Sequence, residues 1–213
     1  MGRGKLIVFE GIDGCGKGTQ IELLSEALAQ RGIDAKLTRE PTGGEIGRLL
    51  RRCLSGEVPA SEEAIAALFA ADRLEHVLGA DGLAKRIEAG ESFICDRYYF
   101  SSYAYHGVRM PLEWVIDANR LCADALRPDL TVFLDIEPSE AVRRVYAGRD
   151  KVEIFENEAR LTEVRDLYLK VFHQMRETER VAVIDGARPR EEIARDVLAR
   201  VLPLFAEETS EVR

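Results

Sequence analysis

The sequence has 213 residues, which is enough for one domain with a full hydrophobic core and room for a small mobile insert. The formal net charge of -8 argues against a nucleic-acid partner, because phosphate backbones require a basic face. No apolar run approaches the roughly 20 residues of a membrane span, and the N-terminus lacks a secretory signal pattern, so we expect no membrane association. Four scattered cysteines without a paired spacing favour buried thiols and a cytoplasmic location over disulfides or a zinc site.

Apolar runs alternate with helical spacings along the chain. Strands are predicted over residues 5–10, 33–38, 92–96, 130–136 and 182–185. Helices are predicted over residues 17–31, 43–54, 61–78, 114–126 and 138–147, and from Pro189 onward. Because the strands are continuous apolar runs, helices should cover both faces of the sheet. The pattern predicts one α/β domain over residues 1–206, with a parallel five-stranded sheet and right-handed crossovers. Residues 207–213 are expected to fray.

A glycine-rich loop follows the first predicted strand and opens the first predicted helix. Residues 11–17 fit the G-x-x-x-x-G-K pattern of a phosphate-binding loop in that context. Backbone N–H groups of such a loop and the helix N-terminus attract phosphate, and the lysine reaches the outer phosphates of a nucleoside triphosphate. We therefore expect ATP to be bound by Gly11, Ile12, Asp13, Gly14, Cys15, Gly16, Lys17, Gly18 and Thr19.

The loop departs from the usual pattern at Gly18, where a Ser or Thr hydroxyl normally binds magnesium. A threonine, Thr19, comes one position later. Mg²⁺ keeps several of its waters in protein sites, so Thr19 or water molecules are expected to substitute for the missing hydroxyl.

Three arginine-bearing motifs follow the phosphate loop. They are TREPTGG at residues 38–44, LFAADRLEHV at 68–77 and CDRYYFSSYAYHG at 95–107. The first and third come directly after predicted strands, and the carboxyl ends of parallel strands form the ligand crevice of such sheets. Arginines gathered around one phosphate loop indicate a second phosphate-bearing ligand, and hence phosphoryl transfer.

The phosphate loop, TREP, LFAADR and DRY…SS.AY.G, in this order and spacing, resemble the thymidylate kinase family of nucleoside monophosphate kinases over about residues 5–200. The resemblance implies a P-loop NTPase fold with a small mobile lid, and transfer of a phosphoryl group from ATP to dTMP with Mg²⁺. It also implies a homodimer. Two alternatives stay open: another nucleotide or deoxynucleoside kinase of the same fold, and a nucleotide-binding protein that catalyses nothing.

The resemblance also implies roles for individual residues. Arg51 and Arg97 resemble clamps on the acceptor phosphate, and Arg73 resembles the group that hydrogen-bonds the base. Phe69 resembles the aromatic that stacks on thymine, with plain core packing as the alternative. The full set implied to bind dTMP is Asp13, Glu40, Arg51, Phe69, Arg73, Arg97, Ser101, Ser102, Tyr105 and His106. His106 stands where the family often has glutamine. The candidate metal holders are Thr19, Glu40 and Asp96.

A densely charged segment, residues 143–165, surrounds Gly148 and reads either as a solvated helix face or as a lid, at about 143–155, that carries cations to phosphate. One branch of the family keeps an arginine after the acid of the phosphate loop, and this chain has none there. The resemblance therefore favours the lid, with Arg149 and then Lys151 as its catalytic cation. The expected catalytic set is Lys17, Asp13, Arg97, Arg149 and Lys151.

Overall fold

The computed structural model describes residues 2–148 and 158–206, without the side chains of 145–148. Its core is a five-stranded sheet in the order β2-β3-β1-β4-β5, in which every neighbouring pair is parallel. The strands are β1 Leu6–Glu10, β2 Ala35–Arg39, β3 Ser92–Asp96, β4 Leu130–Asp135 and β5 Val181–Asp185. The prediction of a parallel α/β sheet is confirmed, and each strand lies within two residues of its expected bounds.

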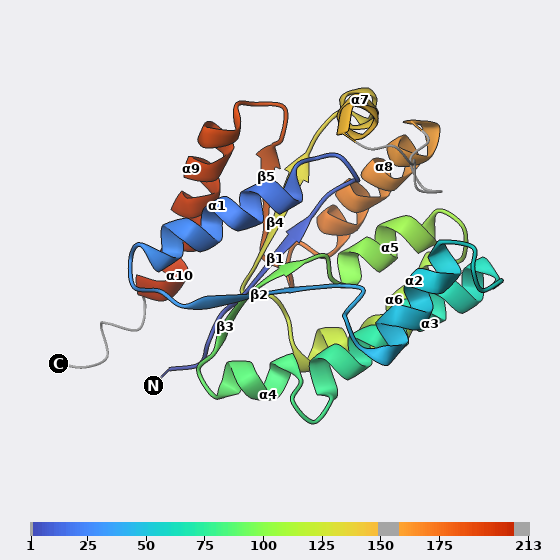
Figure 1. Ribbon diagram of the computed structural model, residues 1–213, viewed down its shortest axis with the longest axis horizontal. Coiled ribbons are helices and arrows are strands. Elements are labelled where there is room, and N and C mark those ends of the chain that lie inside the picture. Colours follow the sequence, from blue (N-terminus) through green and yellow to red (C-terminus); the bar gives the residue numbers. More distant parts are fainter. Residues whose placement is uncertain (1, 149–157, 207–213) are drawn as a thin grey trace.

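Helices cover the sheet on both sides (Figure 1). They are α1 Lys17–Ala29, α2 Glu45–Leu54, α3 Glu62–Leu78, α4 Leu83–Glu88, α5 Tyr99–Gly107, α6 Leu112–Ala125, α7 Pro138–Gly148, α8 Glu158–Gln174, α9 Arg190–Val201 and α10 Pro203–Ala206. Helices α1 and α9 pack side by side, as do α5 and α8, while α3 packs between α2 and α6. In the described residues, no helix is long and apolar enough to cross a membrane.

Three helices were missing from the sequence prediction. The sequence pattern predicts no helix at the short α4. It also assigns the motif after β3 to a strand-end loop, although most of that motif forms α5. The charged segment was expected to be a lid or a solvated face up to residue 165, yet α8 begins at Glu158. The described side of α8 is not only a solvated face, because Leu161, Val164 and Tyr168 are fully buried.

The topology brings two loops together at the centre of the sheet. Strand β1 lies between β3 and β4, and Phe9 pairs with Asp96 near the carboxyl ends of β1 and β3. After β1 the chain passes β3 to form β2, and after β3 it passes β1 in the opposite direction to form β4. A crevice at such a switch point is the general ligand site of open parallel sheets. The loops after β1 and β3 therefore define where to look for function.

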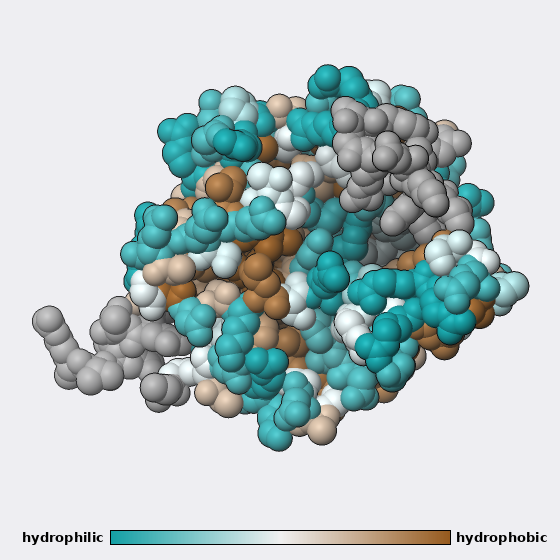
Figure 2. All heavy atoms as spheres, in the orientation of Figure 1, coloured by the Kyte–Doolittle hydropathy of each residue, from teal (hydrophilic) through white to brown (hydrophobic). Residues whose placement is uncertain are grey.

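Strand β2 is an edge strand with one exposed side. Figure 2 shows apolar surface along it between α1 and α4, where Leu37 is 53% exposed. Lys36 directly precedes this leucine and Arg39 follows two positions later. Lys36 forms an ion pair with Glu91, the residue before β3. Charged residues on a short edge strand oppose pairing with the edge of another sheet.

Candidate active site

The loop between β1 and α1 has the geometry of a phosphate-binding loop. Gly16 is the N-cap of α1 with φ of 96°, a left-handed conformation that favours glycine. No side chain caps α1, so a ligand anion can meet the first N–H groups of the helix. A Cβ on Gly11 would come within 2.8 Å of the Leu134 carbonyl oxygen, so the loop can pass this close to β4 only with glycine. Lys17 Nζ lies within the loop and donates to the Gly11 carbonyl at 3.0 Å.

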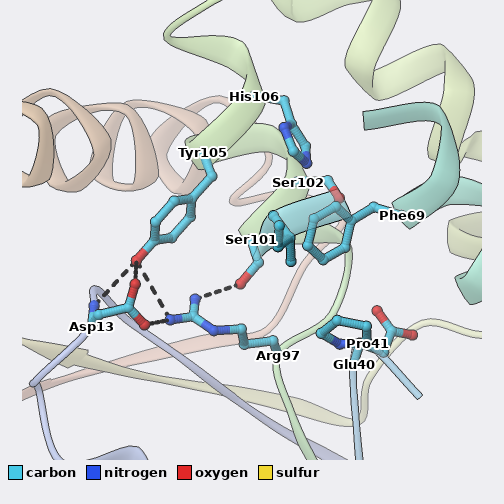
Figure 3. A pocket seen from close by; sticks show the side chains of 10 residues that line it. Asp13, Glu40, Pro41, Phe69, Arg97, Ser101, Ser102, Tyr105 and His106 are labelled. Atoms are coloured by element: carbon cyan, nitrogen blue, oxygen red, sulfur yellow. Dashed lines mark hydrogen bonds and ion pairs between the residues drawn. The ribbon is translucent and has the colours of Figure 1, made fainter. Parts of the chain in front are cut away.

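Asp13 and Arg97 join the loops after β1 and β3. Arg97 Nη2 donates to Asp13 Oδ1, and Tyr105 of α5 donates from its hydroxyl to Asp13 Oδ2 at 3.0 Å (Figure 3). Burial by itself would raise the pKa of Asp13, but the charges of Arg97 and Lys17 and the hydrogen bonds outweigh it and lower the pKa. The structure thus brings together three residues that the sequence assigned to one site, with Asp13 held as a carboxylate.

The backbone at Arg97 is strained. Its φ is 67°, and it is the one non-glycine residue of the described chain in the left-handed region. Such a conformation costs on the order of 1–3 kcal/mol and persists only where the surroundings enforce it. Here Arg97 N donates to the Phe9 carbonyl at 2.9 Å, and the Cys95 thiol donates to the Arg97 carbonyl at 3.1 Å. This turn aims the guanidinium at the phosphate loop instead of along the strand.

A cavity extends from the Asp13–Arg97 pair toward an aromatic end (Figure 3). Its lining residues are Asp13, Glu40, Pro41, Leu54, Phe69, Arg97, Ser101, Ser102, Tyr105 and His106. Phe69 is half-buried and faces His106, with ring centroids 5.1 Å apart. Its position in the cavity wall favours a stacking role over plain core packing. One end of the cavity is therefore charged and suits a phosphate, while the other end is aromatic and suits a base.

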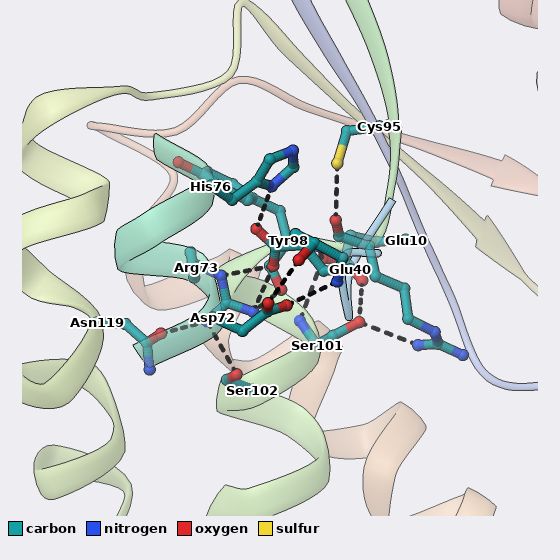
Figure 4. Close-up of polar contacts among 12 residues, drawn as sticks. Glu10, Glu40, Asp72, Arg73, His76, Cys95, Tyr98, Ser101, Ser102 and Asn119 are labelled. Atoms are coloured by element: carbon teal, nitrogen blue, oxygen red, sulfur yellow. Dashed lines mark hydrogen bonds and ion pairs between the residues drawn. The ribbon is translucent and has the colours of Figure 1, made fainter. Parts of the chain in front are cut away.

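Arg73 lies beside this cavity, but its guanidinium points into the protein. It is 1% exposed, and its N–H groups donate to Glu40, Ser102, Asn119 and the Tyr98 carbonyl (Figure 4). Both nitrogens nearest Glu40 lie 2.7 Å from Oε2 of that carboxylate. A guanidinium has five N–H donors, and all are engaged here. Arg73 therefore has no N–H group left in this structure for the expected hydrogen bond to a base.

The loop after β2 is held by side chains of α2 and α3. Asp72 accepts from Thr42 N at 2.7 Å and from the Thr42 hydroxyl at 2.6 Å. Arg51 donates to the carbonyls of Pro41 and Thr42. Arg51, expected as a phosphate clamp, thus supports the loop that carries Glu40 and Pro41 and lies outside the cavity lining.

The three candidate metal holders differ in what they can offer a cation. Asp96 ends β3, and its Oδ1 is buried without a hydrogen-bond partner in the described residues. Glu40 fits less well, because its two oxygens face Arg73 and His76. Thr19 is exposed on the first turn of α1. The described residues contain no cluster of three or more metal-ligating side chains. A cation held by one carboxylate, substrate phosphates and water suits Mg²⁺, and Asp96 is the residue that fits it.

Two expected catalytic residues, Arg149 and Lys151, lie outside the described residues, as do the rest of the lid beyond residue 148 and the tail at 207–213. Conversely, the structure adds residues that the sequence did not single out: Glu10, Asp72, His76, Asn119 and Tyr168. Glu10 could have been recognised in the sequence, because it ends an apolar strand and an acid buried there must be hydrogen-bonded. Asp72 and His76 lie within the LFAADRLEHV motif, in which only the phenylalanine and the arginine were assigned roles, while Asn119 and Tyr168 lie on helices at positions with no distinctive pattern.

The known proteins that this chain resembles belong to one enzyme family. A family model for thymidylate kinase matches residues 9–197 of this chain. A probable thymidylate kinase of Thermococcus kodakarensis is 40% identical, over 95% of this chain and 99% of the relative. A thymidylate kinase of Symbiobacterium thermophilum is 38% identical, over 92% of this chain and 94% of the relative.

These matches span the sheet, the phosphate loop and the cavity, and they agree with the resemblance carried by the sequence motifs. The chain therefore belongs to the thymidylate kinase family.

Proposed function

We propose that this protein transfers the γ-phosphoryl group of ATP to dTMP and releases dTDP and ADP. The observation that carries the proposal is the contact between Asp13 of the phosphate loop and Arg97 at the charged end of a cavity whose far end holds Phe69. A donor phosphate chain on the loop and an acceptor nucleotide in the cavity would meet at this contact. The family membership and the names of the relatives support the same substrates.

The reaction requires the acceptor phosphate oxygen to attack the γ-phosphorus in line with the leaving ADP oxygen. In the proposed mechanism, Lys17 and the N-terminus of α1 bind the donor phosphates, while Arg97 binds the acceptor phosphate. Asp13 orients Arg97 through their ion pair. Such positioned charges contribute mostly by stabilising the negative charge that spreads over the transferring oxygens. Arg149 and Lys151 remain our candidates for an additional cation.

Mg²⁺ is the proposed metal, and Asp96 would hold it through its unpartnered oxygen, with Thr19 as a second candidate acting partly through water. When bound, it would neutralise charge on the donor phosphates. Glu40 is reassigned to positioning Arg73, because both of its oxygens are engaged by protein.

The acceptor can be identified with a panel of dTMP, dUMP, AMP, CMP and free nucleosides, with ATP and Mg²⁺. We expect dTMP to give the highest kcat/KM. Preference for another monophosphate or a nucleoside would make the protein a different kinase of this fold. Tight ATP binding with no transfer to any acceptor would indicate a nucleotide-binding protein without catalysis.

Within the same panel, Phe69→Ala should raise the KM for dTMP by about 10- to 100-fold, because stacking of one base contributes about 1–3 kcal/mol. The KM for ATP should stay within about twofold, since Phe69 lies at the end of the cavity away from the phosphate loop. Equal losses for both substrates would contradict the assignment of this end to the acceptor base.

The metal assignment predicts a specific defect in Asp96→Asn. This change keeps the shape of the side chain and removes the charge that would attract the cation. The Mg²⁺ concentration for half-maximal activity should rise by about tenfold, on the order of 1.4 kcal/mol. Asp34→Asn, at an exposed position just before β2, is the control, and its Mg²⁺ dependence should match the wild type. An unchanged Mg²⁺ dependence in the Asp96 variant would assign the metal to other groups.

His106 is the proposed polar contact for the base, since neither ring nitrogen has a hydrogen-bond partner in the described chain. Burial lowers its pKa to about 4, helped by the positive charges of Arg73 and Arg160. In the unfolded chain a histidine has a pKa of about 6.5. Below that pH the unfolded state binds more protons than the folded state, so the fold loses stability as the pH falls toward 4.

His106→Gln tests this linkage, because glutamine keeps hydrogen-bonding groups without titrating. Between pH 7 and pH 5, the free energy of unfolding of the wild type should fall by about 2 kcal/mol more than that of the variant. Urea denaturation at both pH values measures the difference. His173→Gln, at an exposed position of α8, controls for removal of a histidine. Its free energy of unfolding should depend on pH as that of the wild type does. Parallel pH dependences for the wild type and the His106 variant would show that folding does not lower the pKa of His106.

We also propose a homodimer formed through the exposed face of α6. Trp114 and Leu121 of α6 are 44% and 65% exposed, and their seven-residue spacing puts them on one face of the helix. Leu121→Arg should give a monomer in sedimentation velocity, whereas Leu37→Arg on β2, also an exposed leucine, should leave the dimer intact. A wild-type monomer, or a dimer that survives in the Leu121 variant, would rule out this interface.

A cytoplasmic location fits the state of the cysteines. All four of them, Cys15, Cys53, Cys95 and Cys122, are buried free thiols. Reducing compartments keep thiols in this state. Recovery of the protein in a compartment other than the cytoplasm on cell fractionation would contradict the proposal.

A further inference from the structure

The hydroxyl of Ser101 is a junction between three side chains from three parts of the fold. Ser101 Oγ donates to Glu10 Oε2 at 2.6 Å and lies 2.9 Å from the Tyr168 hydroxyl. It also accepts from Arg97 Nη1 at 3.0 Å, and Figure 3 shows this contact beside the Asp13–Arg97 pair. Ser101 therefore connects the acceptor-side arginine with the end of β1 and with α8.

The carboxylate of Glu10 sets the direction of the hydrogen bonds at this junction. Glu10 is fully buried, and its Oε1 accepts from the backbone N–H groups of Tyr98 at 2.8 Å and Ser101 at 3.1 Å (Figure 4). Its Oε2 accepts from the hydroxyls of Ser101 and Tyr168, the latter at 2.8 Å. Because Glu10 only accepts, the protons of Ser101 Oγ and of the Tyr168 hydroxyl both point at Glu10, and a lone pair of Ser101 Oγ is left to accept from Arg97.

Tyr168 completes this arrangement from α8. Its ring is fully buried against Phe133 and Phe172, at centroid distances of 5.0 and 5.7 Å. Burial raises the pKa of the phenol far above its ordinary value, so the hydroxyl keeps its proton and remains a donor. Because the ring is packed in place, the hydroxyl oxygen is held beside Glu10 and Ser101.

We propose that Tyr168 is a positioning residue for the phosphoryl acceptor site, which fixes Arg97 through Ser101 and Glu10. Arg97 stands on a strained backbone, and its Nη1 has only the Ser101 hydroxyl and the Gly11 carbonyl as described partners. Without the Tyr168 hydroxyl, Ser101 Oγ would keep its bond to Glu10 but lose the contact that fixes its position on the side of α8, and its hydrogen bond from Arg97 would weaken. The inference rests on the proposed function in that Arg97 is taken to bind the acceptor phosphate.

The test is Tyr168→Phe, which removes one oxygen atom and leaves the packed ring. We expect kcat/KM for dTMP to fall by about tenfold, the loss typical of one hydrogen bond in a charged network, while the KM for ATP stays within about twofold. The matched control is Tyr99→Phe. Tyr99 is also fully buried, and its hydroxyl donates to the carboxylate of Glu179 at 2.7 Å, a contact outside the Ser101 junction. Both variants lose a buried phenol–carboxylate bond, so a purely structural role would affect them alike.

A double-mutant cycle tests the route through Ser101. Ser101→Ala removes the junction, so adding Tyr168→Phe to it should change kcat/KM for dTMP by less than about twofold. Ser101→Cys keeps the tyrosine and weakens the same junction, and it should show the same selective loss if Tyr168→Phe proves too unstable to assay. Losses that multiply in the double variant, or dTMP kinetics of Tyr168→Phe within about twofold of those of Tyr99→Phe, would overturn the proposal.

The wild-type enzyme in the same assays separates this proposal from the function itself. If the wild type phosphorylates dTMP and Tyr168→Phe behaves like Tyr99→Phe, the positioning role fails and the function stands. If the wild type prefers another monophosphate, the dTMP assignment fails. The same comparison with that acceptor then decides the role of Tyr168, because Arg97 would meet the phosphate of any nucleoside monophosphate.

Discussion

The buried carboxylate of Glu10 is the interaction on which the active site depends. It lies at the end of the central strand and accepts four hydrogen bonds, two from backbone N–H groups at the start of α5 and two from hydroxyls. Burial raises its pKa, while the nearby charge of Arg97 and these hydrogen bonds oppose the shift. An isolated carboxylate could not be buried at this cost, so the start of α5 and α8 must be in place for β1 to end as it does.

This anchor explains why so many site residues come from one helix. No side chain of α5 itself caps the helix, and the Glu10 carboxylate takes over that role from another strand. Tyr105 and His106, one to two turns further along, then project into the cavity with Ser102. Arg97, in the strained turn before the helix, is oriented by the same arrangement. A single buried acid thereby positions the charged end of the cavity and the wall that α5 contributes.

A second buried network holds the opposite wall. Arg73 joins α3 to the loop after β2 through Glu40 and to α6 through Asn119. Burial would lower the pKa of Arg73, but the charge of Glu40 outweighs it and raises the pKa. Removing one partner of such a buried pair would cost about 3–5 kcal/mol, because the remaining charge would stay desolvated. The network accounts for an arginine in an apolar helix without direct contact to a base.

The local pattern of the sequence determined the parallel α/β sheet and the phosphate loop, while most members of the cavity came from the resemblance of its motifs to a family. Strand runs, glycine spacing and a lysine at a helix start are short-range features, and they specify local backbone geometry wherever they occur. The tertiary structure alone decided what each arginine does. Arg97 reaches the phosphate loop because β1 and β3 are neighbours, whereas Arg51 binds carbonyl groups of the loop after β2 and Arg73 binds the Glu40 carboxylate. The same holds for Tyr168, which meets Glu10 across 158 positions of the chain. Hydrogen-bond partners of buried polar groups are set by which elements pack together, and a linear pattern carries no record of that packing.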